Sequence, residues 1–114
     1  MLPEEDVQQV REWVDARNEA VPVEIRDKVR YEFDVGHHDV TVFECRPPWK
    51  AEFGPEWTRM AVALLGFTTI TNVWSLYRRD SDEVFHEYDT VDPTADVGEL
   101  LAEIDRDPTC IFWG

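Results

Sequence analysis

The segment Arg46-Pro47-Pro48-Trp49 carries the clearest binding chemistry in the sequence. Its two prolines stiffen the backbone where a predicted strand ends, and so fix the directions of Arg46 and Trp49. An arginine beside an aromatic ring can stack on it and still present its guanidinium to a carboxylate or phosphate. The alternative is structural, with Trp49 filling a gap and Arg46 paired to a local acid such as Glu44. The residues alone leave both interpretations open.

His86 is the candidate for acid–base chemistry, because an imidazole titrates near neutral pH. Alternation along its predicted strand places His86 and Tyr88 on the same face. A three-residue turn over 80–82 would put His86 opposite Leu76 and Tyr88 opposite Trp74. His86 could then act as a general base or a ligand, or it could be a hydrogen-bonded histidine at the edge of an aromatic cluster.

The remaining reactive residue types give weaker signals. His37 and His38 are adjacent in a turn, and no H-x-H or C-x-x-C spacing supplies a further metal ligand. Cys45 and Cys110 lie far apart, so we interpret them as small apolar residues of a reducing cytoplasm. No P-loop, dinucleotide-binding, zinc-protease or nucleophile-elbow motif is present. We therefore expect neither a metal nor a cofactor.

Three further arginines, Arg59, Arg78 and Arg79, complete the basic set of the predicted sheet. Alternation directs Arg78 and Arg79 to opposite faces, so only one of them can share a surface with Arg46. A common anion site is one interpretation. The other is a set of separate cross-strand ion pairs with Glu32, Glu44 or Glu87.

These residues lie in a nearly neutral central region between two acidic flanks. Residues 26–79 hold eight of the eleven bases and seven acids, whereas residues 1–25 and 80–114 hold seven and eleven acids. The formal net charge is -14, which repels phosphate backbones and argues against a nucleic-acid partner.

The sequence predicts helices in both flanks and strands between them. Acids follow Pro3, and apolar residues recur at Val7, Val10 and Val14, which indicates a helix to about residue 18. Alternating or apolar runs predict strands at 29–35, 40–46, 60–69, 73–79 and 83–89. Asp96 is a candidate N-cap for a helix ending near Asp107, and residues 111–113 form an apolar tail that we expect to pack on the body.

This order predicts one α+β domain spanning residues 1–114. It contains an N-terminal helix and connector (1–24), an antiparallel sheet of about five strands arranged as a hairpin plus a meander (25–90), and a C-terminal helix with its tail (91–114). Both helices are expected to pack on one face of the sheet. No signal segment opens the chain, and the apolar run 60–67 is far shorter than the ~20 residues that span a bilayer. We therefore expect a cytoplasmic protein without a membrane partner.

The order of several short motifs resembles a bacterial family, domain-of-unknown-function family 3024. The motifs are Phe43-Glu44-Cys45-Arg46-Pro47-Pro48-Trp49, Val73-Trp74-Ser75-Leu76-Tyr77, His86-Glu87-Tyr88, Leu100 through Asp107 and Ile111-Phe112-Trp113-Gly114. The resemblance covers roughly residues 29–114 and excludes the first helix. The family has a basic residue where this chain has Glu87. The resemblance brings no assigned activity, but it implies that the positions to examine are Arg46, Trp49, Trp74, His86, Tyr88 and Gly114.

The sequence favours a non-catalytic binding or interaction module that uses the loop Arg46–Trp57. Its candidate binding residues are Arg46, Trp49, Trp74 and Tyr88, and its ligand is a protein partner or a small anion. The alternative is a small enzyme in which His86 is the general base and Arg46 holds an anion or oxyanion. A third interpretation is a homodimer joined by a sheet edge or by the tryptophan-rich loop.

Overall fold

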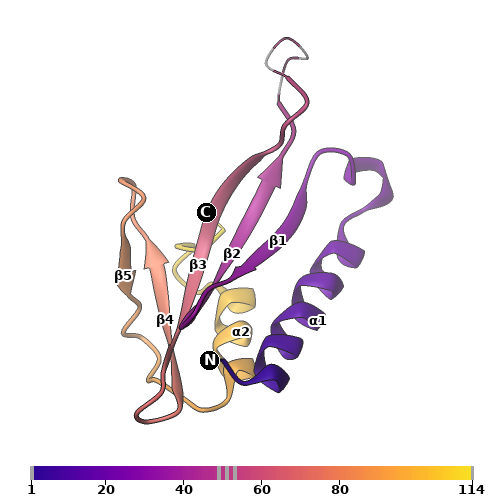
Figure 1. Cartoon of the computed structure of the whole chain (residues 1–114). Coiled ribbons are helices and arrows are strands. Elements are labelled where there is room, and N and C mark those ends of the chain that lie inside the picture. The colour runs from indigo at the N-terminus through magenta and orange to yellow at the C-terminus, as the bar shows by residue number, and fades with distance from the viewer. Residues whose placement is uncertain (1, 49, 51, 53, 114) are drawn as a thin grey trace.

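The computed structural model describes residues 2–48, 50, 52 and 54–113. The elements in chain order are α1 (Glu4–Ala20), the short 3-10 helix η1 (Val23–Ile25), β1 (Arg30–Val35), β2 (Asp39–Arg46), β3 (Thr58–Thr68), β4 (Val73–Arg79), β5 (Phe85–Glu87) and α2 (Val97–Arg106). Figure 1 shows the strands side by side, with both helices on the same side of the sheet. The predicted α+β architecture is therefore confirmed.

The five strands form one antiparallel sheet in the order β1-β2-β3-β4-β5. Each strand thus pairs with its neighbour in sequence, because short turns join antiparallel strands directly. A bulge between β2 and β3 shifts the register at Val42 and Phe43. It allows both Val62 and Ala63 of β3 to be buried, since a bulge interrupts the alternation of side chains.

The predicted length of the last strand and its register were wrong. β5 covers Phe85–Glu87 rather than residues 83–89, and His86 lies opposite Arg78 rather than Leu76. The backbone N–H of Tyr88 donates to Leu76, two residues from the predicted partner, Trp74. The reason lies in the preceding turn, where the Asp80 carboxylate accepts hydrogen bonds from the backbone of Asp82 and Val84 and lengthens the loop.

The two helices cover the sheet face that carries the core. One buried cluster contains side chains of both helices together with side chains from the strands. Its helical members include Val10 and Val14 of α1 and Leu100, Leu101 and Ile104 of α2. On the sheet, the buried residues Val40, Leu65 and Leu76 lie opposite one another across three strands. Alternation therefore directs the intervening residues of these strands to the other face.

The ends of α2 match their predicted chemistry. The Asp96 side chain accepts a hydrogen bond from the backbone N–H of Gly98, which confirms the predicted N-cap. At the other end Asp107 adopts a left-handed conformation, and its carboxylate accepts from the backbone N–H groups of Ile111, Phe112 and Trp113. Phe112 is buried, so the expected packing of the tail is also confirmed.

Within the described residues, neither helix is long and apolar enough to cross a bilayer.

Candidate functional site

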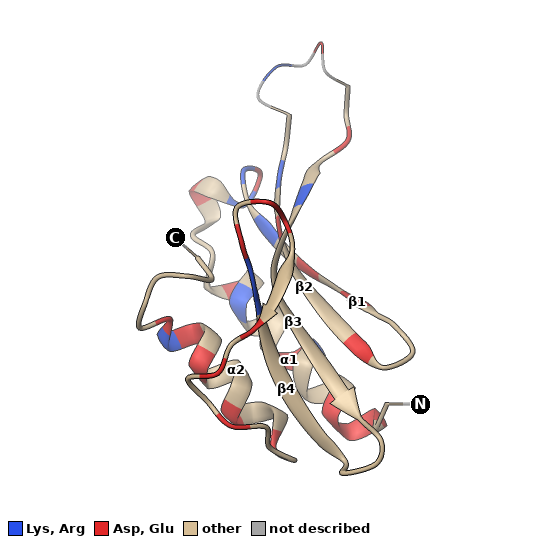
Figure 2. Cartoon of the chain, turned by 90° about the vertical axis from the view of Figure 1, so that its left-hand side faces the viewer, with Lys and Arg blue, Asp and Glu red and all other residues tan. Residues whose placement is uncertain are grey.

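The sheet face turned away from the helices is a candidate binding surface. Thr41, Leu64 and Tyr77 lie opposite one another on β2, β3 and β4, one position along from the buried row. They are half-buried, as are Phe43 and Ala61 on the same face. Figure 2 views the sheet with α1 behind the strands. In the part of the chain that the structure describes, no helix covers this open face.

Two arginine–aromatic pairs border the open face near β1, and we call them the arginine–aromatic cluster (Arg30, Glu32, Asp34, Phe43, Trp57 and Arg59). The Arg59 guanidinium lies 4.0 Å from the centroid of the Phe43 ring. It also donates to both carboxylate oxygens of Asp34 at 2.9 and 3.0 Å. Similarly, Arg30 lies 4.2 Å from the centroid of the Trp57 ring and donates to Glu32 at 2.8 Å.

The arginines and carboxylates of this cluster neutralise one another's charge. The hydrogen bonds from Arg59 hold the pKa of Asp34 below its usual value, and the bond to Asp34 raises the pKa of Arg59. Glu32 also contacts Arg59, with Oε1 3.2 Å from Nε. The sequence-based alternative of cross-strand ion pairs therefore describes Arg59 correctly. Its guanidinium already has carboxylate partners, which argues against a free anion site there.

Cys45 lies between Arg30 and Arg59 in one row across β1, β2 and β3, and it is fully buried. Burial is the main cause that raises the pKa of its thiol, and the negative charge of Glu32 adds to the effect. The thiol therefore stays protonated at neutral pH and is a poor nucleophile. Its packing fits a small apolar residue, as its isolated position in the sequence indicates.

The candidate residues of the predicted loop divide into described and undescribed positions. Arg46 lies at the end of β2, where its Nη2 is 2.6 Å from Glu44 Oε1 and its side chain is 64% exposed. This is the local ion pair that the structural interpretation expected, although the guanidinium remains accessible. Trp49, like Gly114, lies outside the described residues.

Trp74 and Tyr88, the other two candidate binding residues, lie in the core beneath the helices. Trp74 is fully buried, and its indole N–H donates to Asp6 of α1 at 2.9 Å. Tyr88 is also buried, and its hydroxyl donates to Glu103 of α2 at 2.7 Å. Both side chains thus connect the sheet to a helix. The structure does not bring them together with Arg46 on one surface.

Glu103 is a buried acid that sequence reasoning missed. It is 1% exposed and accepts hydrogen bonds from Tyr88 and Arg106. The bond from Tyr88 is the main cause that lowers the pKa of Glu103, and burial opposes it. The available signal was the position of Glu103 at the border of the apolar stripe formed by Leu100, Leu101 and Ile104.

His86 lies in β5 and interacts with a local acid. Its Nε2 is 2.5 Å from Asp80 Oδ2, and its side chain is 47% exposed. The pKa of Asp80 is lowered first by the backbone N–H of Val84 and then by His86. Strands β3 and β4 separate β5 from β2, so His86 and Arg46 are about 14 Å apart across the sheet alone. The enzyme interpretation requires the two side chains in one pocket, and the structure does not bring them together.

A cleft lies elsewhere, between the start of α1 and the turn that joins β1 to β2. It has a volume of about 630 Å³ and is lined by Leu2, Glu4, Val7, Gln8, Arg11, Val35, Gly36 and His37. His37 and His38 are exposed, as predicted for a solvated turn. Among the described residues, no group of three or more potential ligands could hold a metal ion. The sequence did not indicate this cleft, because it arises where the helix diverges from the strand.

A scan against protein-family models matches residues 2–114 to a domain of unknown function, DUF3024. No curated protein and no solved structure matches the chain. The family match includes the first helix, so the narrower extent inferred from the motifs was wrong. The chain belongs to the DUF3024 family.

Proposed function

We propose that this protein is a non-catalytic binding module whose open sheet face and Arg46–Trp57 connection recognise a protein partner. The observation that carries the proposal is the presence of half-buried apolar and aromatic side chains, including Phe43, Leu64 and Tyr77, on a sheet face that no helix of the described residues covers. Surfaces with aromatic residues and stacked arginines are common at the centres of protein interfaces.

A protein partner fits this surface better than a small anion. Arg59 is already neutralised by Asp34 and Glu32, and Arg30 by Glu32, so a bound anion would compete with formed ion pairs. Arg46 is the exception, because its ion pair with a described residue is local and its side chain remains 64% exposed. In this proposal Arg46 contributes a polar contact at the edge of the surface, and the apolar side chains of the open face supply the buried area.

Site-specific photo-crosslinking in the producing cells tests the proposal. A photoreactive side chain at position 64 or 77 should give a discrete crosslinked protein, whereas the same group at Ile70 should not. Ile70 is a suitable control because it is 91% exposed and lies in the β3–β4 turn, outside the face. Equal crosslinking from all three positions would contradict a specific surface. Crosslinks to a second copy, with a doubled mass by light scattering, would identify the partner as this chain itself.

The role of Arg46 is tested by Arg46→Ala. Because Arg46 is exposed and its ion pair is local, the variant should keep its melting temperature within about 2 °C, as expected for a surface substitution. We expect the crosslinked product to decrease. Marked unfolding of the variant in calorimetry would assign Arg46 a structural role.

We further propose the reducing cytoplasm as the site of action. Cys45 and Cys110 are both free, and one of them is exposed. An exposed thiol is more compatible with a reducing compartment than with an oxidising one. Cell fractionation checks this, and recovery of the protein in an oxidising compartment would contradict it.

A further inference from the structure

The outer edge of β1 is partly occupied by a side chain of α1. Strand β1 is the first strand of the sheet and pairs with β2 on one side. On its other side the Asn18 amide donates to the Tyr31 carbonyl at 2.9 Å and accepts from the Tyr31 N–H at 2.8 Å. Asn18 thus makes the two hydrogen bonds that a neighbouring strand would make at this position.

The contact with Asn18 shows which backbone groups of β1 point outward. In an antiparallel pair, residues alternate between bonding the partner strand and facing away from it. Since Tyr31 faces away from β2, Phe33 and Val35 face away as well. Among the described residues, their outward N–H and C=O groups have no hydrogen-bond partner. This part of the edge is therefore open to strand addition.

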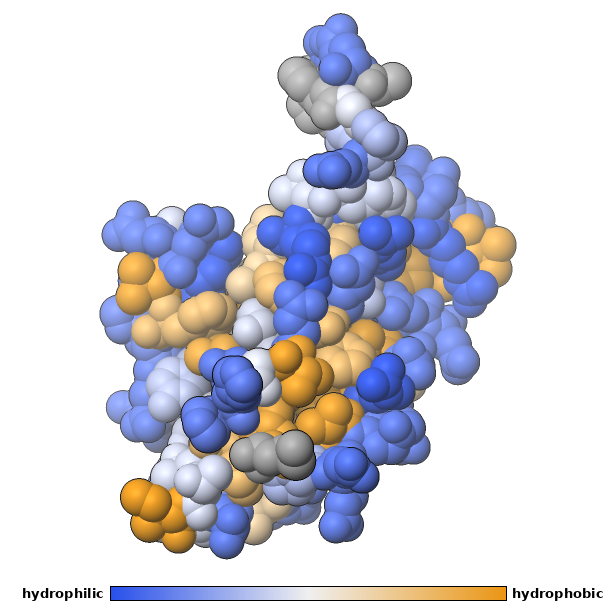
Figure 3. Space-filling model, in the orientation of Figure 1, coloured by the Kyte–Doolittle hydropathy of each residue, from blue (hydrophilic) through white to orange (hydrophobic). Residues whose placement is uncertain are grey.

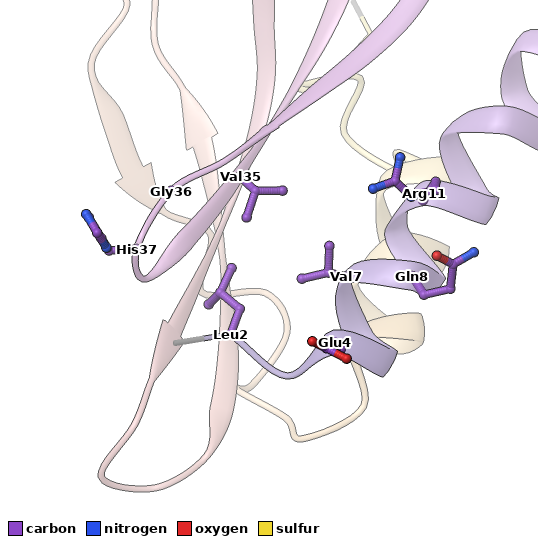
Figure 4. Close-up of a pocket in the computed structure, with 8 residues that line it drawn as sticks. All are labelled: Leu2, Glu4, Val7, Gln8, Arg11, Val35, Gly36 and His37. Carbon is purple, nitrogen blue, oxygen red and sulfur yellow. The ribbon is translucent and has the colours of Figure 1, made fainter.

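The open part of the edge borders the cleft between α1 and the β1–β2 turn. Leu2, Val7 and Val35 contribute its apolar side chains, and Val35 is 50% exposed. Figure 3 shows hydrophobic surface framed by hydrophilic groups in the region between β1 and α1. In Figure 4 the side chains of Leu2, which precedes α1, of Val7 in α1 and of Val35 in β1 point into the space between them. The volume of about 630 Å³ is ample for side chains of a bound peptide.

Arg11 gives the cleft a positive group beside Phe33. Its guanidinium lies 5.3 Å from the centroid of the Phe33 ring and lines the cleft. No carboxylate of the described residues lies within ion-pairing distance of Arg11. The two open positions of β1 therefore differ, because Phe33 adjoins a cation and Val35 adjoins an apolar surface.

We propose that β1 and α1 together bind an extended peptide segment of a partner protein, which adds to the sheet as a strand beyond β1. The backbone of the segment bonds Phe33 and Val35. Side chains two residues apart point to the same face, so an acidic side chain opposite Phe33 meets Arg11. An apolar side chain opposite Val35 enters the cleft. The recognised pattern is thus an acidic and an apolar residue separated by one residue.

A short peptide fits this edge better than a second copy of the chain. Asn18 occupies the position of Tyr31, which leaves two outward positions for pairing. Two β1 strands that pair with each other need a longer free edge, whereas strand addition by a peptide gains its specificity from side-chain pockets beside the edge. This site is separate from the open sheet face, so its failure would leave the proposed function unaffected.

The test uses a seven-residue, end-capped fluorescent peptide with Asp and Leu separated by one Thr and flanked by Thr and Ser. Fluorescence polarisation should show saturable binding, with a loss of tenfold or more when Asp is replaced by Lys or Leu by Ser. Arg11→Glu should reverse the preference between the Asp and Lys peptides. Lys28→Glu makes the same charge change at an exposed position in the turn before β1, outside both proposed surfaces, and should leave the affinity unchanged.

Backbone pairing is tested separately from side-chain recognition. Peptides N-methylated at the residues that donate to β1 should lose binding at least tenfold, since methylation removes the donor. Bound peptide should slow amide hydrogen exchange at Phe33 and Val35 but not at Ser75 of β4. Binding that tolerates N-methylation, or exchange protection elsewhere only, would overturn the proposal. Dimerisation that protects the same amides without peptide would also overturn it.

Discussion

The buried carboxylate of Glu103 provides the sharpest test of how the core is organised. Its oxygens accept from the Tyr88 hydroxyl at 2.7 Å and from the Arg106 guanidinium, and its side chain is 1% exposed. A hydrogen bond to a charged group contributes about 1.5–3 kcal/mol, against about 0.5–1.5 kcal/mol for a neutral pair. We expect Glu103→Gln to lower the free energy of unfolding by about 1–2 kcal/mol at neutral pH. Tyr88→Phe should cost about 2–3 kcal/mol, because it leaves a buried carboxylate oxygen without a donor.

The effect of Glu103→Gln should depend on pH. The pKa of Glu103 is lowered from its usual value of 4.5, so the unfolded chain binds the proton more readily than the folded one. The stabilisation by the carboxylate is therefore fully present above the unfolded pKa and is lost as the pH falls through the folded pKa. Because glutamine does not titrate, the difference in unfolding free energy between wild type and Glu103→Gln should shrink as the solution is acidified.

Urea unfolding followed by tryptophan fluorescence, repeated from pH ~7 down to pH ~3, measures this difference. Glu99→Gln is the matched control, since Glu99 is an exposed acid of the same helix and should change stability by at most about 0.5 kcal/mol. A difference that stays constant with pH would refute the reasoning. Additive losses in the Tyr88→Phe, Glu103→Gln double variant would also refute it, because groups that share a hydrogen bond are coupled.

Two further predictions concern the tail and the cysteines. Asp107→Ala should cost about 1–3 kcal/mol, because three backbone N–H groups of the tail lose their acceptor, and amide exchange at Ile111 and Phe112 should accelerate. Unchanged exchange at those amides would show that the side chain does not hold the tail. Maleimide labelling of the native protein, read by mass spectrometry, should modify the exposed Cys110 and spare the buried Cys45. Equal labelling rates would contradict the burial of Cys45.

Much of the sheet could be predicted because its local signals agree. Strict alternation from Val29 to Val35 predicted β1 to within one residue, and β4 runs from Val73 to Arg79 as expected. The helices and segments that the structure describes cover these strands on one face, so burial repeats every two residues, and the sequence shows the same period. The same alternation predicted that the side chains of Arg78 and Arg79 point to opposite faces of the sheet. The residues opposite them on β5 are also adjacent in the chain and therefore lie on opposite faces as well.

β5 was less predictable because its length depends on a turn with its own hydrogen bonds. Asp80 holds the backbone of Asp82 and Val84, and Glu83 adopts a positive φ of 64°. A residue other than glycine rarely takes this conformation, and the apolar pattern carries no sign of it. The loop therefore includes residues that the alternation had assigned to the strand.

The candidate sites were the least predictable part of the molecule. Trp74 and Tyr88 stand out in the sequence as large side chains with polar atoms, but their hydrogen bonds to Asp6 and Glu103 assign them to the core. Conversely, Arg59 became prominent only when the strand register placed it over Phe43 and beside Asp34. Such contacts join residues far apart in the chain, so spacing along the sequence does not encode them.

The sequence by itself determined the order of the elements, the two faces of the strands and the ends of α2, since these depend on interactions between residues close in the chain. Only the tertiary structure decided that Asn18 occupies part of the β1 edge and that a cleft opens beside the remainder. These features depend on the angle and distance at which separate elements pack. Those quantities follow from the fit of whole surfaces and not from any local pattern.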